Sequence, residues 1–275
     1  MRIVHFSDLH LGVFPPAIFS LPAKCFLGAA NYWLHRRRHF RPEMIARLAE
    51  QLPALAPDLV ICTGDLVNIS IPEEFALARK QLQPILDWAG ERFVYVPGNH
   101  DAYVDDPRCQ EALEQTFFQL NSGRWQLSEL PAILRHGDVV LLLINGARPA
   151  SFWLSNGSLN ETDQARINAL LQEPRRPNEI RLGVCHFPVL SSNGNSLGLG
   201  WLRGLDGGDS IRRHLQQREI DVLLCGHIHY PFTVTKPNGA IQICPGSLTM
   251  KATFAVIDRV PDEPRLHYEY IKLTQ

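Results

Sequence analysis

Five short apolar runs in the sequence are each followed at once by polar side chains that can bind metal ions. These side chains are Asp8, His10, Asp65, Asn99, His100, Asp101, His186, His227 and His229. Carboxylate, imidazole and amide groups suit Mn²⁺, Fe or Zn²⁺ and require no thiolate. They are too many for one ion, whereas two ions roughly 3.5–4 Å apart can share a carboxylate and clamp a phosphate. The pattern therefore predicts a dinuclear metal centre for phosphate ester chemistry.

Each of these clusters taken alone also has a purely structural explanation. Gly64-Asp65 would be ordinary turn chemistry, and Asp8 could cap a helix. Under that explanation five clusters would have to arise independently, each directly after a predicted strand. The repeated position favours a functional site.

Local spacing indicates how the donors could converge. Two pairs are separated by a single residue, so in an extended segment both members of a pair would face the same side. These pairs are Asp8 with His10 and His227 with His229. Glycines at positions 64, 98 and 226 directly precede donors and would allow tight turns and close backbone approach.

The apolar runs before the donors are almost continuous, as expected for strands buried on both faces. Amphipathic segments between them indicate helices, three of which have a proline in or just before the first turn. The predicted strands are Arg2–Phe6, Leu59–Thr63, Phe93–Val96, Val139–Ile144, Ile180–Cys185 and Asp221–Cys225. The predicted helices are Pro42–Leu52, Glu73–Ala89, Pro107–Leu120, Glu161–Gln172 and Asp209–Arg218.

From about Thr233 the pattern changes to strands joined by turns, with Asn238-Gly239 as a strong turn signal. We predict one domain over residues 1–275, built from two mixed sheets flanked by helices. In open α/β sheets, ligands bind at the carboxyl ends of the strands. The donor clusters should therefore meet in space.

The composition limits the choice of partners and compartment. The formal net charge is −1, so a global basic field for nucleic acid is absent and nucleic acid is not the expected partner. Six cysteines occur without any CxxC spacing, and we expect them to be reduced. The sequence shows no signal peptide and no apolar run long enough to span a membrane. We expect a cytoplasmic protein.

Five motifs, in this order, resemble those of the calcineurin-like metallophosphoesterases: SDLH, GDL, GNHD, HFP and GHIH. Each motif is weak alone, but the ordered set is specific and covers most of the chain. The resemblance implies a four-layer α/β/β/α sandwich of two mixed sheets flanked by helices, and a metal-dependent phosphoric ester hydrolase. No motif position is missing, which favours an active enzyme.

The resemblance also implies a role for each donor. Asp8, His10 and His229 would bind one metal ion, Asn99, His186 and His227 the other, and Asp65 would bridge both. A bridging hydroxide would attack phosphorus in line with the leaving oxygen. His100 would lie close to the substrate without binding metal, and would stabilise the transition state or protonate the leaving group. Asp101 would orient and charge the His100 imidazole.

Residues 13–41, which we call the insertion, separate the first motif from the first helix of the core. Phe26, Ala30 and Trp33 are at helical spacing within it, and a run rich in arginine and histidine follows over residues 35–41. Three interpretations stand: a helix packed on the domain with a solvated basic end, a lid whose arginines hold substrate phosphates, or an amphipathic anchor on anionic lipid. The third would give peripheral membrane contact.

The predicted function is a phosphodiesterase that acts on a small nucleotide-type substrate, because the motifs resemble the cyclic-nucleotide phosphodiesterase branch. Asn99, His100 and Arg203 are the predicted substrate contacts; Arg203 lies in the Gly-rich segment 190–209. The alternatives are a membrane-associated pyrophosphatase of a nucleotide-linked lipid, a DNA exonuclease, and a non-catalytic binding module stabilised by metal. The sequence identifies neither the native metals nor the oligomeric state.

Overall fold

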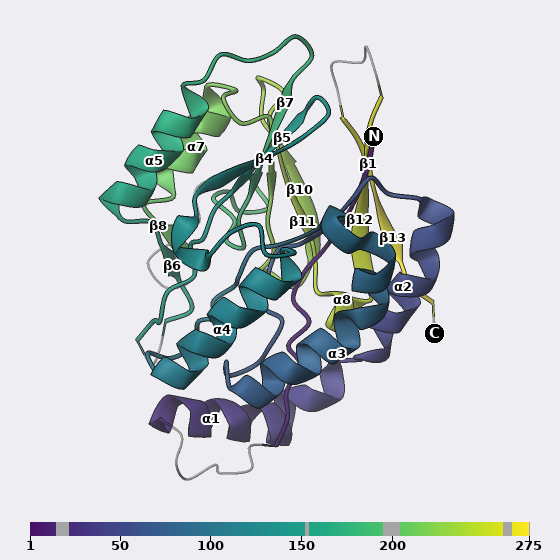
Figure 1. Cartoon of the computed structure of the whole chain (residues 1–275), viewed down its shortest axis with the longest axis vertical. Helices are drawn as coiled ribbons and strands as arrows, with labels where there is room; N and C mark the ends of the chain where they lie inside the picture. Colours follow the sequence, from purple (N-terminus) through teal and green to yellow (C-terminus); the bar gives the residue numbers. More distant parts are fainter. Residues whose placement is uncertain (15–21, 152–153, 195–203, 261–265, 275) are drawn as a thin grey trace.

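Two large mixed sheets form the centre of the computed structural model, which describes residues 1–14, 22–151, 154–194, 204–260 and 266–274 (Figure 1). The first sheet has the strand order β13-β12-β1-β2-β3. In it β1, β2 and β3 run parallel, and β12 pairs antiparallel with both β1 and β13. The bounds are β1 Arg2–Phe6, β2 Leu59–Cys62, β3 Phe93–Tyr95, β12 Thr253–Arg259 and β13 Leu266–Lys272.

The second sheet has the strand order β10-β11-β9-β7-β5-β4. Its four central strands run parallel, and the edge strands β4 and β10 are antiparallel to their neighbours. The bounds are β4 Ala132–His136, β5 Val139–Leu143, β7 Ile180–Val184, β9 Val222–Leu224, β10 Pro231–Thr235 and β11 Ile241–Pro245. A separate parallel ladder joins β6 (Gly157–Ser158) to β8 (Leu205–Asp206).

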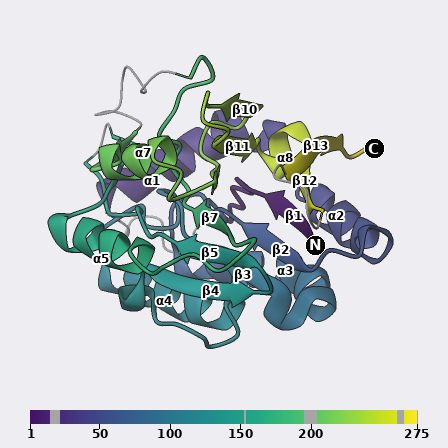
Figure 2. The same cartoon turned by 90° about the horizontal axis from the view of Figure 1, so that it is seen from above.

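Helices cover the outer faces of both sheets, as Figure 2 shows from above. Along β5, Leu141 and Leu143 belong to the large core shared with the first sheet, whereas Leu142 packs with Ile167 of α5 (Glu161–Leu171) and Ile211 of α7 (Asp209–Gln216). This alternation is the period-two geometry of a strand buried on both faces. The helices are α2 Glu43–Leu55, α3 Pro72–Ala89, α4 Pro107–Leu120, α5 Glu161–Leu171, α7 Asp209–Gln216 and the short α8 Leu248–Lys251. The four layers confirm the predicted α/β/β/α sandwich.

The predicted elements form close to their expected bounds. All six predicted strands up to residue 225 are present, and the strand-rich end consists of β10 to β13 with Asn238-Gly239 in the turn between β10 and β11. β4 is absent from the prediction because, after the buried Ala132, its residues are only partly buried and include Arg135 and His136. An edge strand of this kind lacks the apolar run that marks the central strands.

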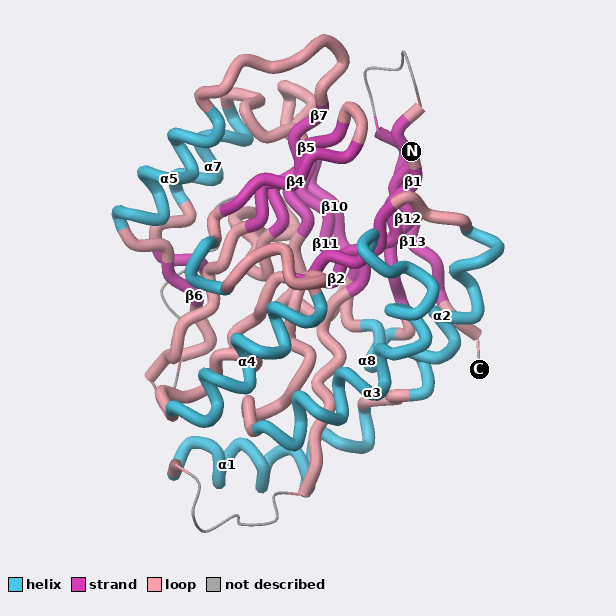
Figure 3. The backbone as a smooth tube through the Cα atoms, in the orientation of Figure 1, coloured by secondary structure: helices cyan, strands magenta, loops and turns pink. Residues whose placement is uncertain are grey.

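The insertion forms a helix that packs on the loops leading into α3 and α4. Helix α1 (Ala23–Asn31) continues through a π-helical turn, Tyr32–Arg36, into a 3-10 turn, Arg37–His39 (Figure 3). Its buried residues are Cys25, Ala29 and Tyr32, and the first two pack with Ile69, Ile71, Val104 and Cys109. The apolar stripe recognised in the sequence, which contains Phe26, lies one residue away from this buried face, and Phe26 itself is 39% exposed.

Within the described residues, no helix combines the length and the apolar character that crossing a membrane requires. Peripheral membrane contact through the insertion stays a prediction.

Candidate active site

The predicted donors lie at one edge of the two sheets, in the loops that follow β1, β2, β3, β7 and β9. Backbone hydrogen bonds join these loops to one another. The N–H of Leu9 donates to the carbonyl of Asp65 at 2.8 Å, and the N–H of Gly226 donates to the carbonyl of His186 at 2.8 Å. The carboxyl ends of strands from two sheets therefore build one site, as the topology of open sheets predicts.

A first group of donors comprises Asp8, His10, Asp65 and His229, whose ligand atoms all lie within 4.8 Å of one another. Nε2 of His10 is 2.8 Å from Nε2 of His229 and 3.7 Å from Oδ1 of Asp8. Two imidazole nitrogens at this distance need a proton or a cation between them, and the buried carboxylates supply negative charge. The group fits a metal ion.

A second group comprises Asp65, His186 and His227. Asn99 joins it, because its Oδ1 lies 2.9 Å from Nδ1 of His227. Nδ1 of His186 donates to the carbonyl of Thr63 at 2.5 Å, which orients Nε2 toward the site. That Nε2 is buried and has no hydrogen-bond partner in the described chain. A buried nitrogen left in this way fits a metal ligand.

Asp65 belongs to both groups. Its Oδ1 accepts a hydrogen bond from the backbone N–H of His100 at 2.8 Å. Its Oδ2 lies 3.6 Å from Nε2 of His10 and 3.4 Å from Nε2 of His186. One carboxylate oxygen therefore faces both groups of imidazoles.

The donors stand on left-handed rather than extended backbone. Asp8, His10, Asp65, His227 and His229 have φ values of 59°, 47°, 55°, 72° and 58°. The prediction that the paired donors share a face because their segments are extended is therefore wrong, since β1 already ends at Phe6. Non-glycine residues rarely adopt this region, and such strain is found mainly where the surrounding structure enforces it at functional sites.

All three predicted glycines are required by close approach, and a Cβ atom on Gly64, whose φ is 92°, would lie 2.4 Å from the backbone nitrogen of Gly98. A Cβ atom on Gly98 would lie 2.6 Å from the backbone nitrogen of Asp65, and one on Gly226 would lie 2.8 Å from Oδ2 of Asp8. No side chain tolerates these distances. These glycines bring neighbouring loops close enough for their donors to meet.

Electrostatics divide the donors into charged and neutral groups. Burial alone would raise the pKa of Asp8, but hydrogen bonds from His10 and His229 outweigh it and hold this pKa well below its usual range. Burial lowers the pKa of His10 and of His227 to about 3. Burial would also lower the pKa of His186, yet the charge of Asp65 raises it to about 10. The carboxylates thus favour positive charge at the site, which a metal ion would supply in place of the His186 proton, while the other two imidazoles are already neutral.

His100 lies beside the donor groups without belonging to either. Its ring meets that of His10 edge-on at 4.7 Å and stacks on Tyr103 at 5.4 Å with an interplanar angle of 12°. Nδ1 donates to the carbonyl of Asn68 at 2.6 Å. The remaining ring nitrogen, Nε2, is the atom that this arrangement leaves for a substrate.

Asp101 does not orient the His100 imidazole, and that prediction is wrong. Its Oδ2 accepts from the backbone N–H groups of Asp65 and Gly98, each at 2.8 Å, and its Oδ1 accepts from Leu66 at 2.8 Å and Val67 at 3.2 Å. The carboxylate therefore ties the loop after β2 to the loop after β3. The carbonyl of Asn68 orients the imidazole instead.

The sequence reasoning missed Phe40, Asn68 and Tyr103. Phe40 packs on His10 at 5.1 Å between ring centroids, and Tyr103 stacks on His100. Asn68 acts through its backbone carbonyl, and every residue type has one, so the sequence does not indicate this role. Tyr103 follows the last residue of the GNHD motif by two positions, and its aromatic side chain close to that motif was the available clue. Arg203 lies outside the described residues.

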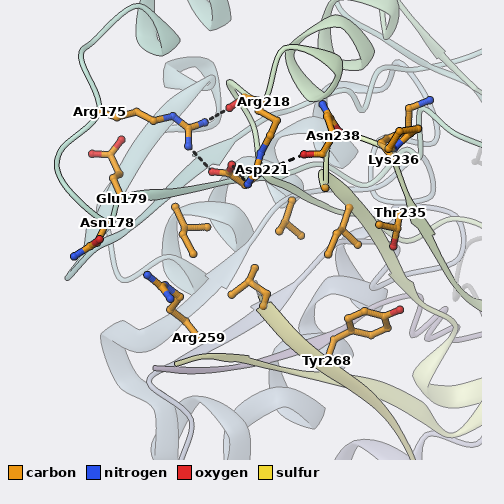
Figure 4. Close-up of a pocket in the computed structure, with 16 residues that line it drawn as sticks. Arg175, Asn178, Glu179, Arg218, Asp221, Thr235, Lys236, Asn238, Arg259 and Tyr268 are labelled. Carbon is orange, nitrogen blue, oxygen red and sulfur yellow. Dashed lines mark hydrogen bonds and ion pairs between the residues drawn. The ribbon is translucent and has the colours of Figure 1, made fainter. Parts of the chain in front are cut away.

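A large cavity lies elsewhere in the described part of the chain. It has a volume of about 1110 Å³, and Figure 4 shows Arg175, Arg218 and Asp221 among the side chains that line it. Ile180, Val222 and Ile241 line it at the starts of β7, β9 and β11, so it lies at the opposite strand ends from the donors. No member of either donor group lines it. The site is therefore defined by its chemistry and not by cavity size.

Comparison with known proteins places this geometry in a family. The chain is 20% identical over 244 residues to a component of the nuclease SbcCD of Staphylococcus saprophyticus, covering 85% of this chain and 58% of that protein. It is 23% identical over 195 residues to a cAMP/cGMP dual specificity phosphodiesterase of Mycobacterium tuberculosis, covering 70% of this chain and 56% of that protein. The chain thus spans somewhat more than half the length of these curated relatives.

Among solved structures, a dimetal phosphatase from Danio rerio superposes with a TM-score of 0.67. The alignment covers 98% of this chain and 95% of that one at 13% identity, which supports the fold. The family model for calcineurin-like phosphoesterases matches residues 1–231. The chain therefore belongs to the calcineurin-like phosphoesterases, a family of metal-dependent phosphoester hydrolases.

Proposed function

We propose that this protein is a dinuclear-metal phosphodiesterase that hydrolyses phosphate esters of a small nucleotide-type substrate. The observation that carries the proposal is Oδ2 of Asp65, which lies within 3.6 Å of imidazole nitrogens in both donor groups. A carboxylate oxygen shared in this way is what a bridging ligand between two ions requires. His100 beside the donor groups supplies a further polar group for the substrate.

The residues of the first group, Asp8, His10, Asp65 and His229, would hold one ion, and Asp65 with Asn99, His186 and His227 would hold the other. Two ions bound there supply Lewis-acid polarisation of a phosphoryl group and lower the pKa of a coordinated water. The protein's own contribution is to fix the donors. The carbonyl of Thr63 orients His186, and the backbone of His100 orients Asp65.

His100 would act on the leaving group. The carbonyl of Asn68 keeps a proton on Nδ1, so Nε2 is the nitrogen that would exchange a proton with the substrate. Stacking on Tyr103 holds the ring in place. This arrangement would move a proton at Nε2 without displacing any metal donor.

The nucleotide class of substrate is supported by the two curated relatives, one of which is a cyclic-nucleotide phosphodiesterase and the other a component of a nuclease. Both names describe phosphodiester hydrolysis. The near-neutral balance of 27 basic and 28 acidic residues favours a small substrate over a nucleic acid.

The test is hydrolysis of bis-p-nitrophenyl phosphate, cyclic AMP and single-stranded DNA by the purified protein with Mn²⁺. We expect hydrolysis of the first two. Asp65→Asn should lose bound metal, which elemental analysis measures, because the substitution weakens the ligand that both ions would share. Its kcat should fall by at least about 10²-fold as a result. Asp138→Asn, which changes an exposed carboxylate in the turn between β4 and β5, is the matched control. Wild-type protein that binds Mn²⁺ and cleaves none of the three would contradict the proposal.

A further inference from the structure

The insertion exposes an unusual share of the chain's apolar side chains. Eight large apolar residues are exposed in the described part of the chain, and four of them belong to the insertion, which is 29 residues long in a chain of 275. Leu34, Phe14 and Leu27 are 73%, 64% and 49% exposed, and Phe26 is the fourth. Single exposed apolar residues are ordinary, but several in one short segment mark a surface that binds a partner.

Helix α1 is covered by the domain on one side. Its buried residues and that of the following π-helical turn, Cys25, Ala29 and Tyr32, recur at helical spacing and form the inner side. Leu27 and Leu34 are seven positions apart and stand on the outer side. In Figure 1 helix α1 lies at the periphery beside α3 and α4, and no described element is drawn beyond it. A helix that is merely packed on a domain has polar residues on its outer side, so the structure favours an anchor.

Aromatic rings and cations adjoin this outer side. The Phe14 ring meets the Trp33 ring edge-on at 5.8 Å between centroids, and the guanidinium carbon of Arg37 lies 4.3 Å from the centroid of the Trp33 ring. Arg37 and its neighbour Arg38 are both exposed. Tryptophan rings and arginine side chains are the groups that proteins place at the level of lipid head groups.

Charge is divided unevenly between the insertion and the rest of the chain. Of 27 basic and 28 acidic side chains, five basic ones and no acidic one fall within the insertion, which leaves 22 basic and 28 acidic elsewhere. The insertion is therefore a cationic segment on a chain that is otherwise net negative. An anionic surface would attract the insertion and repel the remainder, and would thus orient the protein.

The exposed apolar side chains distinguish between a lipid surface and a nucleic acid as the anionic partner. A phosphate backbone is bound by cations and polar groups and offers little to an aliphatic side chain. The interface of a bilayer takes up leucine and aromatic side chains, while its anionic head groups attract arginine. A lipid surface therefore accounts for both the apolar and the cationic residues, and a nucleic acid accounts only for the second.

We propose that the outer side of the insertion binds the surface of membranes that contain anionic lipid. The residues that form this contact are Phe14, Leu27, Trp33, Leu34, Arg37 and Arg38. The protein would lie on the bilayer without crossing it, with the apolar side chains in the head-group region. This proposal concerns where the protein acts and does not depend on which ester it hydrolyses.

The bound orientation would bring the candidate active site close to the membrane. Tyr32, on the inner side of the insertion, stacks on Phe40 at 6.0 Å between centroids, and Phe40 packs on His10 at 5.1 Å. The insertion and the Phe40 ring therefore separate the proposed lipid contact from the first donor group.

The experiment sediments the full chain with two kinds of vesicle, at low and at high salt. One kind is phosphatidylcholine alone, and the other is equal parts of phosphatidylcholine and phosphatidylglycerol. We expect the protein to pellet with the anionic vesicles at low salt and to be partly released at high salt, because salt screens the arginines. No pelleting with the anionic vesicles, or equal pelleting with both kinds, would overturn the proposal. Since no turnover is measured, this failure is distinct from failure of the proposed function.

Substitutions test whether the outer side makes the contact. Leu34→Glu should weaken binding to the anionic vesicles at least about tenfold, because it removes an inserted side chain. Arg38→Gln should weaken it about fivefold, the effect of one cation near an anionic surface. Tyr268→Glu on β13 and Arg213→Gln on α7 make similar changes at exposed positions outside the insertion and should bind like the wild type. Controls that lose as much binding as the insertion variants would overturn the proposal.

Two further measurements separate lipid from other partners of the same surface. Light scattering without vesicles reports self-association, and a wild-type dimer that Leu34→Glu converts to a monomer would assign the surface to a second copy of the chain. Single-stranded DNA that binds more tightly than the vesicles, with the same dependence on Leu34 and Arg38, would assign it to nucleic acid. Either result would overturn the lipid contact. Melting temperatures equal to that of the wild type would show that the variants are folded, as expected for exposed side chains.

Discussion

His100 is held by contacts that leave a single nitrogen for chemistry. The Asn68 carbonyl accepts a hydrogen bond from Nδ1–H, the Tyr103 ring stacks on one face of the imidazole, and the His10 ring meets the imidazole edge-on. The contacts to Asn68 and Tyr103 involve no member of either donor group. Removing the imidazole should therefore affect turnover and not metal binding.

His100→Ala should retain both metal ions and lower kcat by roughly 10²–10⁴-fold, the range for loss of a general acid. Metal content by elemental analysis and steady-state kinetics with bis-p-nitrophenyl phosphate check this. His39→Ala, which removes an exposed imidazole of the insertion, is the control and should be neutral. A His100→Ala protein that turns over at the wild-type rate would disprove the assigned role.

The donors themselves carry backbone strain, since five of them have φ in the left-handed region. Each such residue costs of order 1–3 kcal/mol. The cost is sustained by hydrogen bonds that fix the loops, for example from Ser247 Oγ to the carbonyl of Asp8 at 2.6 Å. At this scale the site is a strained arrangement that the rest of the fold enforces.

Among the elements, the loop from β2 to α3 is fixed by two buried carboxylates. Asp101 accepts hydrogen bonds from the N–H groups of Leu66 and Val67 in the first half of this loop. Glu74 accepts hydrogen bonds from the N–H groups of Asn68 at 3.1 Å and Ile69 at 2.7 Å. Because Asn68 orients His100, Glu74 supports the active site from the first turn of α3. Burial raises the pKa of Glu74 from 4.5 to about 8.

This shift makes stability depend on pH. The folded chain keeps a proton on Glu74 that the unfolded chain loses above about pH 4.5, so the contribution of Glu74 is complete below that pH and is lost as pH rises through about 8. Glu74→Gln should reduce the dependence of the unfolding free energy on pH between about pH 4.5 and 8, by at most about 1.4 kcal/mol per pH unit. Urea unfolding of both metal-free proteins at pH 5, 6.5 and 8 measures the difference. Parallel curves would show that Glu74 is ionised throughout.

For the whole molecule, the site joins the two sheets. The first donor group combines loops after β1 and β2 with His229 after β9, and the second combines Asp65 and Asn99 of the first sheet with His186 and His227 of the second. Ions bound there would crosslink layers that otherwise meet through the apolar core. Ligands that bind only the folded state stabilise it.

Removal of metal with a chelator should therefore lower the melting temperature. At a free metal concentration of about 100 times Kd the stabilisation is about 2.7 kcal/mol, which corresponds to a shift of roughly 5–10 °C for a chain of this size. Calorimetry with and without chelator measures it. Asp65→Asn should show a much smaller response, and an equal response in both proteins would place the stabilising metal elsewhere.

The sequence predicted the layers of the fold because continuous apolar runs mark buried strands at any position, as for β1 and β5. It also predicted which residue types gather at the site. It could not predict the partners of Asp101, since a carboxylate beside an imidazole in sequence is equally able to accept backbone N–H groups from a distant loop. The sequence could not predict the role of Asn68 either, because its backbone carbonyl and not its side chain accepts the hydrogen bond from His100.

By itself, the sequence predicted the donor set, the family and the positions along the chain of the strands that carry the donors, because these depend on residue type and on local periodicity. The tertiary structure alone decided how the donors divide between two groups and which oxygen of Asp65 faces both. Those properties depend on left-handed turns and on contacts between loops of different sheets. Such contacts join residues far apart in the chain, 219 positions for His10 and His229 and 239 for Asp8 and Ser247, and no local pattern encodes them.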